Sequence, residues 1–180
     1  LAAIIPDYAD RRLIAEANSP RRVGVFADVM PQNIVTAVYN YELDCVQLQG
    51  SESPVMIDNL RRTLDPDICK GVRIIKTLYV TNKDDLKSSR QYSAHADMLV
   101  FNMKSDDMEG ALSRSDFELL DEYDGGLPFL AGGIAMEDLD GLKAISNPCF
   151  AGVDLNEGFE TEPGVKDISK LKDFISLLRK

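Results

Sequence analysis

Short apolar runs alternate with helical patterns along almost the whole of this chain of 180 residues. The apolar runs, each of which predicts a β-strand, cover residues 1–5, 23–26, 45–48, 73–78, 98–101, 129–131 and 150–153. Between them, apolar residues at helical spacing predict helices over residues 32–41, 54–64, 84–92, 115–123, 137–145 and 167–178. Strands that are apolar on both faces are typical of a parallel sheet covered by helices. The alternation therefore predicts an α/β fold.

Seven strands are one fewer than the eight of a closed (β/α)8 barrel. The sequence begins with Leu1, where a natural start would be methionine, so we expect an upstream β/α unit that this sequence lacks. We predict a TIM (β/α)8-type barrel, with its first β/α unit missing, in a single domain over residues 1–180. An open doubly wound sheet is the alternative, although that fold usually places its phosphate loop after the first strand.

Turns that contain glycine follow the last two predicted strands. Residues 129–134 read Phe-Leu-Ala-Gly-Gly-Ile, and residues 150–160 read Phe-Ala-Gly-Val-Asp-Leu-Asn-Glu-Gly-Phe-Glu. Such turns leave backbone N–H groups that can face an anion, and the loops after strands seven and eight of a (β/α)8 barrel commonly hold a substrate phosphate. We therefore predict phosphate binding at Gly132 and Gly133. The alternative is that these glycines only permit tight packing.

Composition narrows the possible functions. With 44% apolar residues the chain is long enough for one well-buried domain, and its net charge of -10 argues against nucleic acid as a partner. Its apolar runs are far shorter than the roughly 20 residues that cross a bilayer, so we expect no membrane partner. Cys45, Cys69 and Cys149 are odd in number and widely separated, as in a cytosolic protein with reduced thiols. A single histidine, His95, argues against structural zinc.

Several short stretches are informative when they are taken together and in order. They read Arg-Val-Gly-Val-Phe (22–26), Leu-Asp-Cys-Val-Gln-Leu-Gln-Gly-Ser-Glu (43–52), Ile-Ile-Lys (74–76), Pro-Phe-Leu-Ala-Gly-Gly-Ile (128–134), Gly-Val-Asp (152–154), Glu160, Pro-Gly (163–164) and Lys-Asp (166–167). Over nearly the whole chain they resemble phosphoribosylanthranilate isomerase of tryptophan biosynthesis. The resemblance implies a (β/α)8 barrel that catalyses an Amadori rearrangement of N-(5-phosphoribosyl)anthranilate, a phosphorylated small molecule, in the cytoplasm. It implies no metal and no organic cofactor, and a monomer or a homodimer.

The implied reaction needs an acid that protonates the ring oxygen and a base that removes a proton from the adjacent carbon. The resemblance places Asn102 at the position of the acid, which is an aspartate in the family. Because an amide cannot supply a proton at neutral pH, we expect Asn102 to support binding and orientation; without the resemblance it reads equally well as a turn residue. The family's base is a cysteine in a Lys-x-Cys-Gly stretch, which nothing in this sequence matches. Cys45 is a poor substitute because it should lie in the packed interior of the barrel.

The resemblance also implies residues that bind the substrate. Gln49 stands where the family has a histidine, and Asp154 ends the last strand. Arg11, or Arg12 beside it, would supply the family's arginine, with a solvated surface charge as the alternative. The acidic segment 106–110 replaces a glycine-rich loop of the family, and we expect it to repel the anionic substrate.

Further positions follow from the same comparison of sequences. Asn156 and Glu157 occupy the loop where the family uses small hydroxyl residues, and we predict that they join the phosphate site, with the Glu157 carboxylate pointing outward. We expect Asp116 to be the N-cap of a helix or to place a negative charge in its first turn. We expect residues 166–167 to start the last helix. Lys76 either reaches a ligand from inside the barrel or pairs with a carboxylate.

Three functions remain open from the sequence. The first is a phosphoribosylanthranilate isomerase. The second is a catalytically silent relative that binds a phosphorylated ligand or a protein partner. The third is another phosphate-binding barrel, such as a ribulose-phosphate epimerase, but that enzyme would need several metal-binding histidines and this chain has one.

Overall fold

The computed structural model describes residues 2–4, 20–65, 68–103 and 112–179. The strands are β1 (Ala2–Ile4), β2 (Val23–Phe26), β3 (Cys45–Leu48), β4 (Arg73–Tyr79), β5 (Met98–Asn102), β6 (Phe129–Gly132), β7 (Phe150–Asp154), β8 (Glu160–Glu162) and β9 (Val165–Lys166). The α-helices are α2 (Pro31–Tyr41), α3 (Pro54–Leu64), α4 (Lys83–Ser88), α5 (Arg114–Leu120), α6 (Leu139–Ala144) and α7 (Ile168–Leu178). Short 3-10 helices are η1 (Ser89–Tyr92), η2 (Met136–Asp138) and η3 (Glu157–Phe159).

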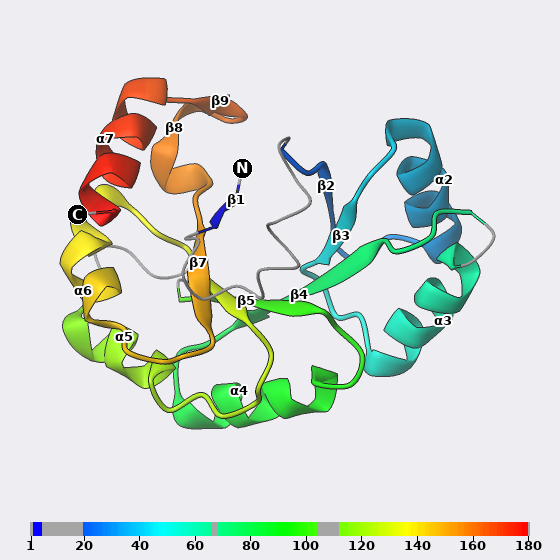
Figure 1. The fold of residues 1–180 in the computed structure, drawn as a ribbon, viewed down its shortest axis with the longest axis horizontal. Helices are drawn as coiled ribbons and strands as arrows, with labels where there is room; N and C mark the ends of the chain where they lie inside the picture. The colour runs from blue at the N-terminus through cyan, green and yellow to red at the C-terminus, as the bar shows by residue number, and fades with distance from the viewer. Residues whose placement is uncertain (1, 5–19, 66–67, 104–111, 180) are drawn as a thin grey trace.

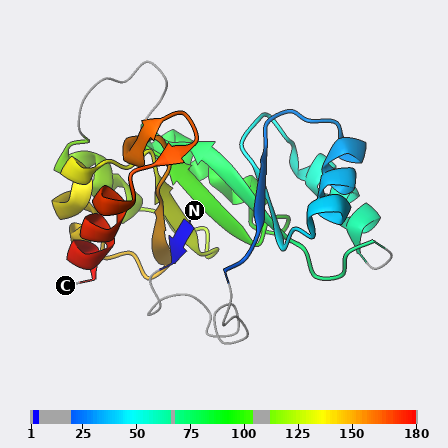
Figure 2. The ribbon, with the colours of Figure 1, turned by 90° about the horizontal axis from the view of Figure 1, so that it is seen from above.

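Strands β2 to β7 form a parallel sheet in which each strand pairs with the next one along the chain. Figure 1 shows the helices around the outside of this sheet, with β2 and β7 on opposite sides of the centre. Seen from above in Figure 2, the sheet lies between α2 and α3 on one side and α5, α6 and α7 on the other. A doubly wound sheet would instead reverse its strand order and carry helices on both faces. The order of the strands therefore supports the predicted barrel-type fold.

The prediction for the first strand was wrong in direction. Residues 1–5 were expected to form a parallel strand, but β1 pairs antiparallel with β7, with Ala2 opposite Asp154. Since β1 and β2 are the two ends of the seven-stranded sheet, the barrel is not closed within the described residues. The edge of β7 presents N–H and C=O groups that a short extended segment can pair with in either direction.

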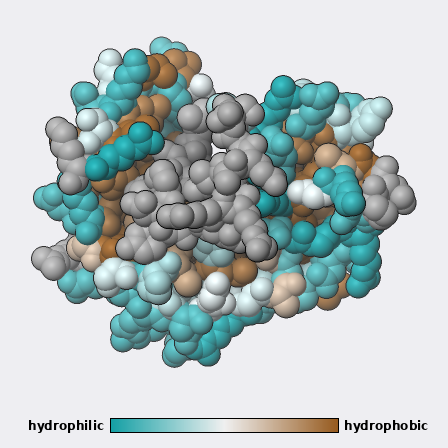
Figure 3. Space-filling view, viewed as in Figure 1, coloured by the Kyte–Doolittle hydropathy of each residue, from teal (hydrophilic) through white to brown (hydrophobic). Residues whose placement is uncertain are grey.

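Alternate residues of the strands face two apolar layers. The outer layer, between the sheet and the helices, includes Val46, Ile74 and Leu99. The inner layer, enclosed by the curve of the sheet, consists of Cys45, Ile75, Met98, Val100, Leu130 and Ala151. Burial raises the pKa of the Cys45 thiol, which disfavours the thiolate, so the structure confirms that Cys45 belongs to the packed interior. On the face shown in Figure 3, hydrophilic residues predominate around the rim, and hydrophobic residues show between them.

Polar side chains begin several helices where the sequence indicates a start. Ser53 caps α3, with Pro54 in the first turn, and its side chain accepts a backbone N–H one turn further on. Asp167 caps α7 in the same way. Asp116 lies in the first turn of α5 and accepts the backbone N–H of Ser113 at 2.7 Å. The predicted roles of Asp116 and Asp167 are therefore confirmed, whereas Lys166 ends β9 instead of starting the helix.

Candidate functional site

Most of the predicted site residues lie at one edge of the sheet, which we call the mouth. The mouth is defined by Gln49, which directly follows β3, and by the last residues of β5, β6 and β7, which are Asn102, Gly132 and Asp154. Because neighbouring parallel strands end at the same edge, the fold places these residues on one side of the barrel, where (β/α)8 enzymes carry their active sites. Arg11, Arg12 and the acidic segment 106–110 lie outside the described residues.

A glutamine spans the interior of the barrel below the mouth. Gln47 Nε2 donates hydrogen bonds to Thr77 Oγ1 at 3.1 Å and to Asp154 Oδ2 at 3.2 Å. Because β4, β5 and β6 separate β3 from β7 in the sheet, this amide connects opposite walls of the barrel. The two-residue period of β3 predicts that Gln47 faces inward. This period carries no signal for the contact of Gln47 with Asp154, which lies 107 positions away in the sequence.

Asn102 and Asp154 flank Gly132 at the mouth. A Cβ on Gly132 would lie 3.8 Å from Asn102 Cα, 3.8 Å from Asp154 Cβ and 3.0 Å from Val100 Cγ1. A larger residue at position 132 would therefore crowd Val100 and lie beside the backbone of Asn102 and the Cβ of Asp154. The backbone of Asn102 is held in the sheet, where its carbonyl accepts the N–H of Val80 at 3.0 Å. The arrangement places an amide residue and a carboxylate residue on β5 and β7, the two strands on either side of β6.

The two predicted phosphate loops lie against each other. Gly133, directly after β6, has a φ of +73°, which favours glycine. A Cβ on Gly158, after β7, would lie 2.3 Å from the carbonyl oxygen of Ile134 and 3.2 Å from Ala135 Cα. Lys170 Nζ donates to the carbonyl of Gly158 at 2.8 Å, which adds a positive charge beside the same loop. Gly158 belongs to the second glycine-containing turn of the sequence, whereas no sequence pattern indicates the contact of Lys170, which lies on α7.

The hairpin formed by β8 and β9, which the sequence did not predict, fixes the other side of the second loop. Lys166 donates to the side-chain oxygen of Asn156 and forms an ion pair with Glu160. The hydrogen bond from Lys166, and then the N–H of Gly164, lower the pKa of the Glu160 carboxyl from its ordinary value of 4.5. Asn156 and Glu157 are both exposed at the start of η3. Phosphate binding by these two residues stays a prediction.

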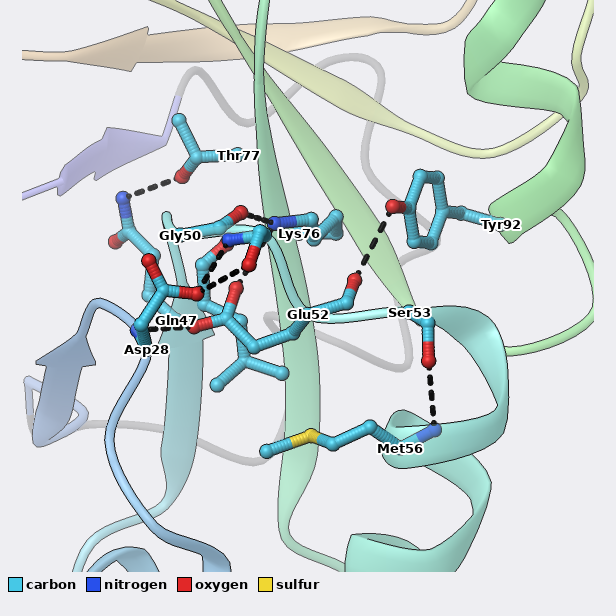
Figure 4. A network of polar contacts seen from close by, with 11 residues as sticks. Asp28, Gln47, Gly50, Glu52, Ser53, Met56, Lys76, Thr77 and Tyr92 are labelled. Atoms are coloured by element: carbon cyan, nitrogen blue, oxygen red, sulfur yellow. Dashed lines mark hydrogen bonds and ion pairs between the residues drawn. The ribbon is translucent and has the colours of Figure 1, made fainter.

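Lys76 lies outside the barrel interior. Its neighbours Ile75 and Thr77 face inward, so Lys76 faces the helices, and its side chain is 1% exposed. Its Nζ lies 3.0 Å from Glu52 Oε2 (Figure 4). Of the two alternatives that the sequence left open, the structure therefore supports the pairing with a carboxylate.

Other features bear on metals and membranes. Among the residues that the structure describes, no three His, Cys, Asp or Glu side chains are grouped as they would be around a metal ion. His95 Nδ1 lies 2.8 Å from Asp58 Oδ1. Because His95 precedes the start of β5, it lies at the end of the barrel opposite the mouth. None of the described helices is long and apolar enough to cross a membrane.

Comparisons with known proteins point to one family. The family profile of N-(5'phosphoribosyl)anthranilate (PRA) isomerase matches residues 8–177. The N-(5'-phosphoribosyl)anthranilate isomerase of Parabacteroides distasonis is 37% identical over 162 residues, which are 89% of this chain and 70% of that protein. The crystal structure of the Thermotoga maritima isomerase has a TM-score of 0.72 at 26% identity, covering 94% of this chain and 78% of that one. An isomerase in complex with reduced 1-(o-carboxyphenylamino)-1-deoxyribulose 5-phosphate has a TM-score of 0.70 at 22% identity, covering 94% and 77%.

Proposed function

This chain belongs to the N-(5'-phosphoribosyl)anthranilate isomerase family, and we propose that it binds the phosphoribosyl anthranilate of tryptophan biosynthesis and isomerises it. The observation that carries the proposal is the close approach of Gly158 to Ile134, which joins the loops after β6 and β7 into one backbone surface beside the mouth. Backbone N–H groups in such turns, together with the ammonium of Lys170, favour a phosphate at this position.

The rest of the substrate would then extend across the mouth. With the phosphate at the two loops, the ribose lies over Asn102 and Asp154, and the anthranilate extends toward Gln49 after β3. Asn102 donates a hydrogen bond to the ring oxygen but delivers no proton, so the proton that ring opening requires comes from solvent water. Asp154, whose carboxylate accepts a hydrogen bond from Gln47, lies at the mouth and can accept a proton from the substrate. We therefore expect saturable binding and slow turnover.

The proposal includes the setting of the reaction. The substrate is a phosphorylated small molecule, and we propose that the protein works in the cytoplasm as a monomer or a homodimer, without nucleic acid, a membrane or a cofactor. The family match gives no support to the silent relative or to the epimerase. The 5-phosphate analogue that one related isomerase binds is a suitable probe for this chain.

The test combines binding with turnover. Calorimetric titration with the reduced 5-phosphate analogue should show saturable binding that inorganic phosphate weakens by competition. Loss of substrate fluorescence should be slow, below about 1 per second. Faster turnover would show that Asn102 does not stand at the position of the acid. If neither binding nor turnover is found, the proposed function is wrong.

A further inference from the structure

Lys76 uses all of its hydrogen-bonding capacity within the protein. Its Nζ lies 2.5 Å from the carbonyl oxygen of Gly50, 3.0 Å from Glu52 Oε2 and 3.3 Å from the carbonyl oxygen of Leu48 (Figure 4). An ammonium has three N–H donors, so each has an acceptor. The pair of Lys76 and Glu52 is buried, with side chains 1% and 2% exposed. Burying two charges costs free energy that an apolar pair of similar volume would not.

The acceptors of Lys76 belong to a single turn. Leu48 and Gly50 lie on either side of Gln49, so Lys76 holds the backbone before and after the one residue of this turn that was predicted to bind substrate. The N–H of Gln49 is also fixed, because it donates to the carbonyl of Phe26 at 2.9 Å. Gln49 itself is exposed at the mouth. The buried lysine thus constrains the main chain that presents an exposed, polar side chain.

The same network reaches the turn after β2. Glu52 Oε1 accepts the backbone N–H of Asp28 at 2.8 Å, and Asp28 Oδ1 accepts both the N–H and the hydroxyl of Ser51, at 2.7 and 2.6 Å. These hydrogen bonds from Ser51 lower the pKa of the Asp28 carboxyl. Asp28 has a φ of +53°, which is strained for a residue other than glycine. Such strain persists where the surroundings impose it, and it is concentrated at functional sites.

We propose that Lys76, acting through Glu52, is a positioning residue that holds the turns after β2 and β3 so that Gln49 meets the anthranilate end of the substrate. The inference rests on the proposed function of the mouth. It assigns a role to a part of the fold that is distant from the phosphate loops, because β4 and β5 separate β3 from β6 in the sheet. Loss of the network should therefore affect one end of the ligand and spare the other.

The experiment removes both charges together, since removal of one would leave the other buried without a partner. The variant is K76M/E52Q. The matched control is K83M/E122Q, which makes the same chemical changes in an ion pair whose side chains are 65% and 48% exposed. Each protein is titrated with the reduced 5-phosphate analogue and, separately, with inorganic phosphate. Hydrogen exchange is measured at the amides of Asp28, Ser51 and Gly133.

We expect K76M/E52Q to bind the analogue about tenfold more weakly, in line with the sensitivity of bound ligands to small misplacements, and to keep its affinity for inorganic phosphate. The amides of Asp28 and Ser51 should exchange faster, and that of Gly133 should not change. The control should match the wild type in every measurement. Equal losses of affinity for the analogue and for inorganic phosphate, or unchanged hydrogen exchange at Asp28 and Ser51, would overturn the inference.

A different experimental outcome would show that the proposed function itself is wrong. If the wild type binds neither ligand, the proposed function is wrong, and the exchange at Asp28 and Ser51 alone decides whether Lys76 holds the two turns. Should K76M/E52Q fail to fold, Ser51→Ala replaces it, since this exposed substitution removes only the hydroxyl bond to Asp28. Ser51→Ala should weaken binding of the analogue about threefold, which is a small part of the effect of misplacement. The affinity for inorganic phosphate should not change. An unchanged affinity for the analogue would overturn the inference.

Discussion

Gly158 lies so close to Ile134 that a Cβ on residue 158 would be 2.3 Å from the carbonyl oxygen of residue 134. Gly158 follows β7 and Ile134 follows β6, so the contact joins loops from two neighbouring strands. No side chain fits between them unless the backbone moves. The proposed function requires that N–H groups of both loops face one anion, and this proximity brings the two loops together.

Gly158→Ala should separate the two loops. We expect a loss of about 1 to 3 kcal/mol in the free energy of unfolding, as for other overpacked sites, and at least about tenfold weaker binding of inorganic phosphate. Urea unfolding and calorimetry measure the two effects. Gly126→Ala is the control, because Gly126 has a φ of +78° but no atom within 4 Å of the added Cβ. It should lower stability and leave phosphate binding unchanged; a similar loss of phosphate binding in both variants would contradict the loop contact.

Asn102→Asp restores a proton donor at the position of the acid. General acid catalysis contributes about 100-fold or more, so we expect turnover of the phosphoribosyl anthranilate to rise by at least about that factor, measured by the loss of substrate fluorescence. Asn102→Leu, which removes the amide, should not raise turnover. If the aspartate variant is no faster than the wild type, the amide at position 102 is not what limits the reaction.

Gln47→Leu removes the donor that connects β3 with Asp154. We expect binding of the reduced 5-phosphate analogue to weaken about tenfold because the carboxylate loses its orientation. Thr77→Val keeps the bond between Gln47 and Asp154 and should change the affinity less than about threefold. Titration of both variants is the measurement. A larger effect from Thr77→Val than from Gln47→Leu would show that the orientation of Asp154 does not depend on Gln47.

The ion pair of Lys166 with Glu160 predicts a pH dependence of stability. Because the folded-state pKa of Glu160 is lowered from 4.5, its contribution is fully present above that value and is lost as the pH falls through the lower folded-state pKa. The difference in unfolding free energy between the wild type and Glu160→Gln should therefore shrink below about pH 4.5. In a Lys166→Met background the same difference should decline less. Urea unfolding from pH 7 to 3 checks this, and a difference that grows on acidification would be incompatible with the ion pair.

The periodicity of the sequence predicts most of the fold. Apolar runs bounded by turn residues locate β2 to β7, and the positions of Ser53 and Asp167 locate two helix starts. The direction of β1 was predicted wrongly, because pairing at a sheet edge depends on neighbouring backbone rather than on the composition of the strand. The hairpin of β8 and β9 was missed because its strands are too short to show a period.

The resemblance places Asn102 and Asp154 at the candidate site, and the glycine turn after a predicted strand places Gly132 there. The structure confirms only their position, because all three residues end neighbouring parallel strands at one edge of the sheet. Contacts between distant parts of the chain were not predictable. Lys76 pairs with a residue 24 positions away, and Gln47 contacts one 107 positions away, and no local pattern encodes either pairing.

A titration with inorganic phosphate, followed through the backbone amide NMR shifts of the isotope-labelled protein, decides whether the loops after β6 and β7 form a phosphate site. We expect saturable shifts that are largest at Gly133, Ile134 and residues 156–158, with little change at the amides of Asp28 and Ser51. Shifts that are absent, or that are spread over lysine-rich surfaces without saturation, would contradict phosphate binding at these loops and with it the proposed function.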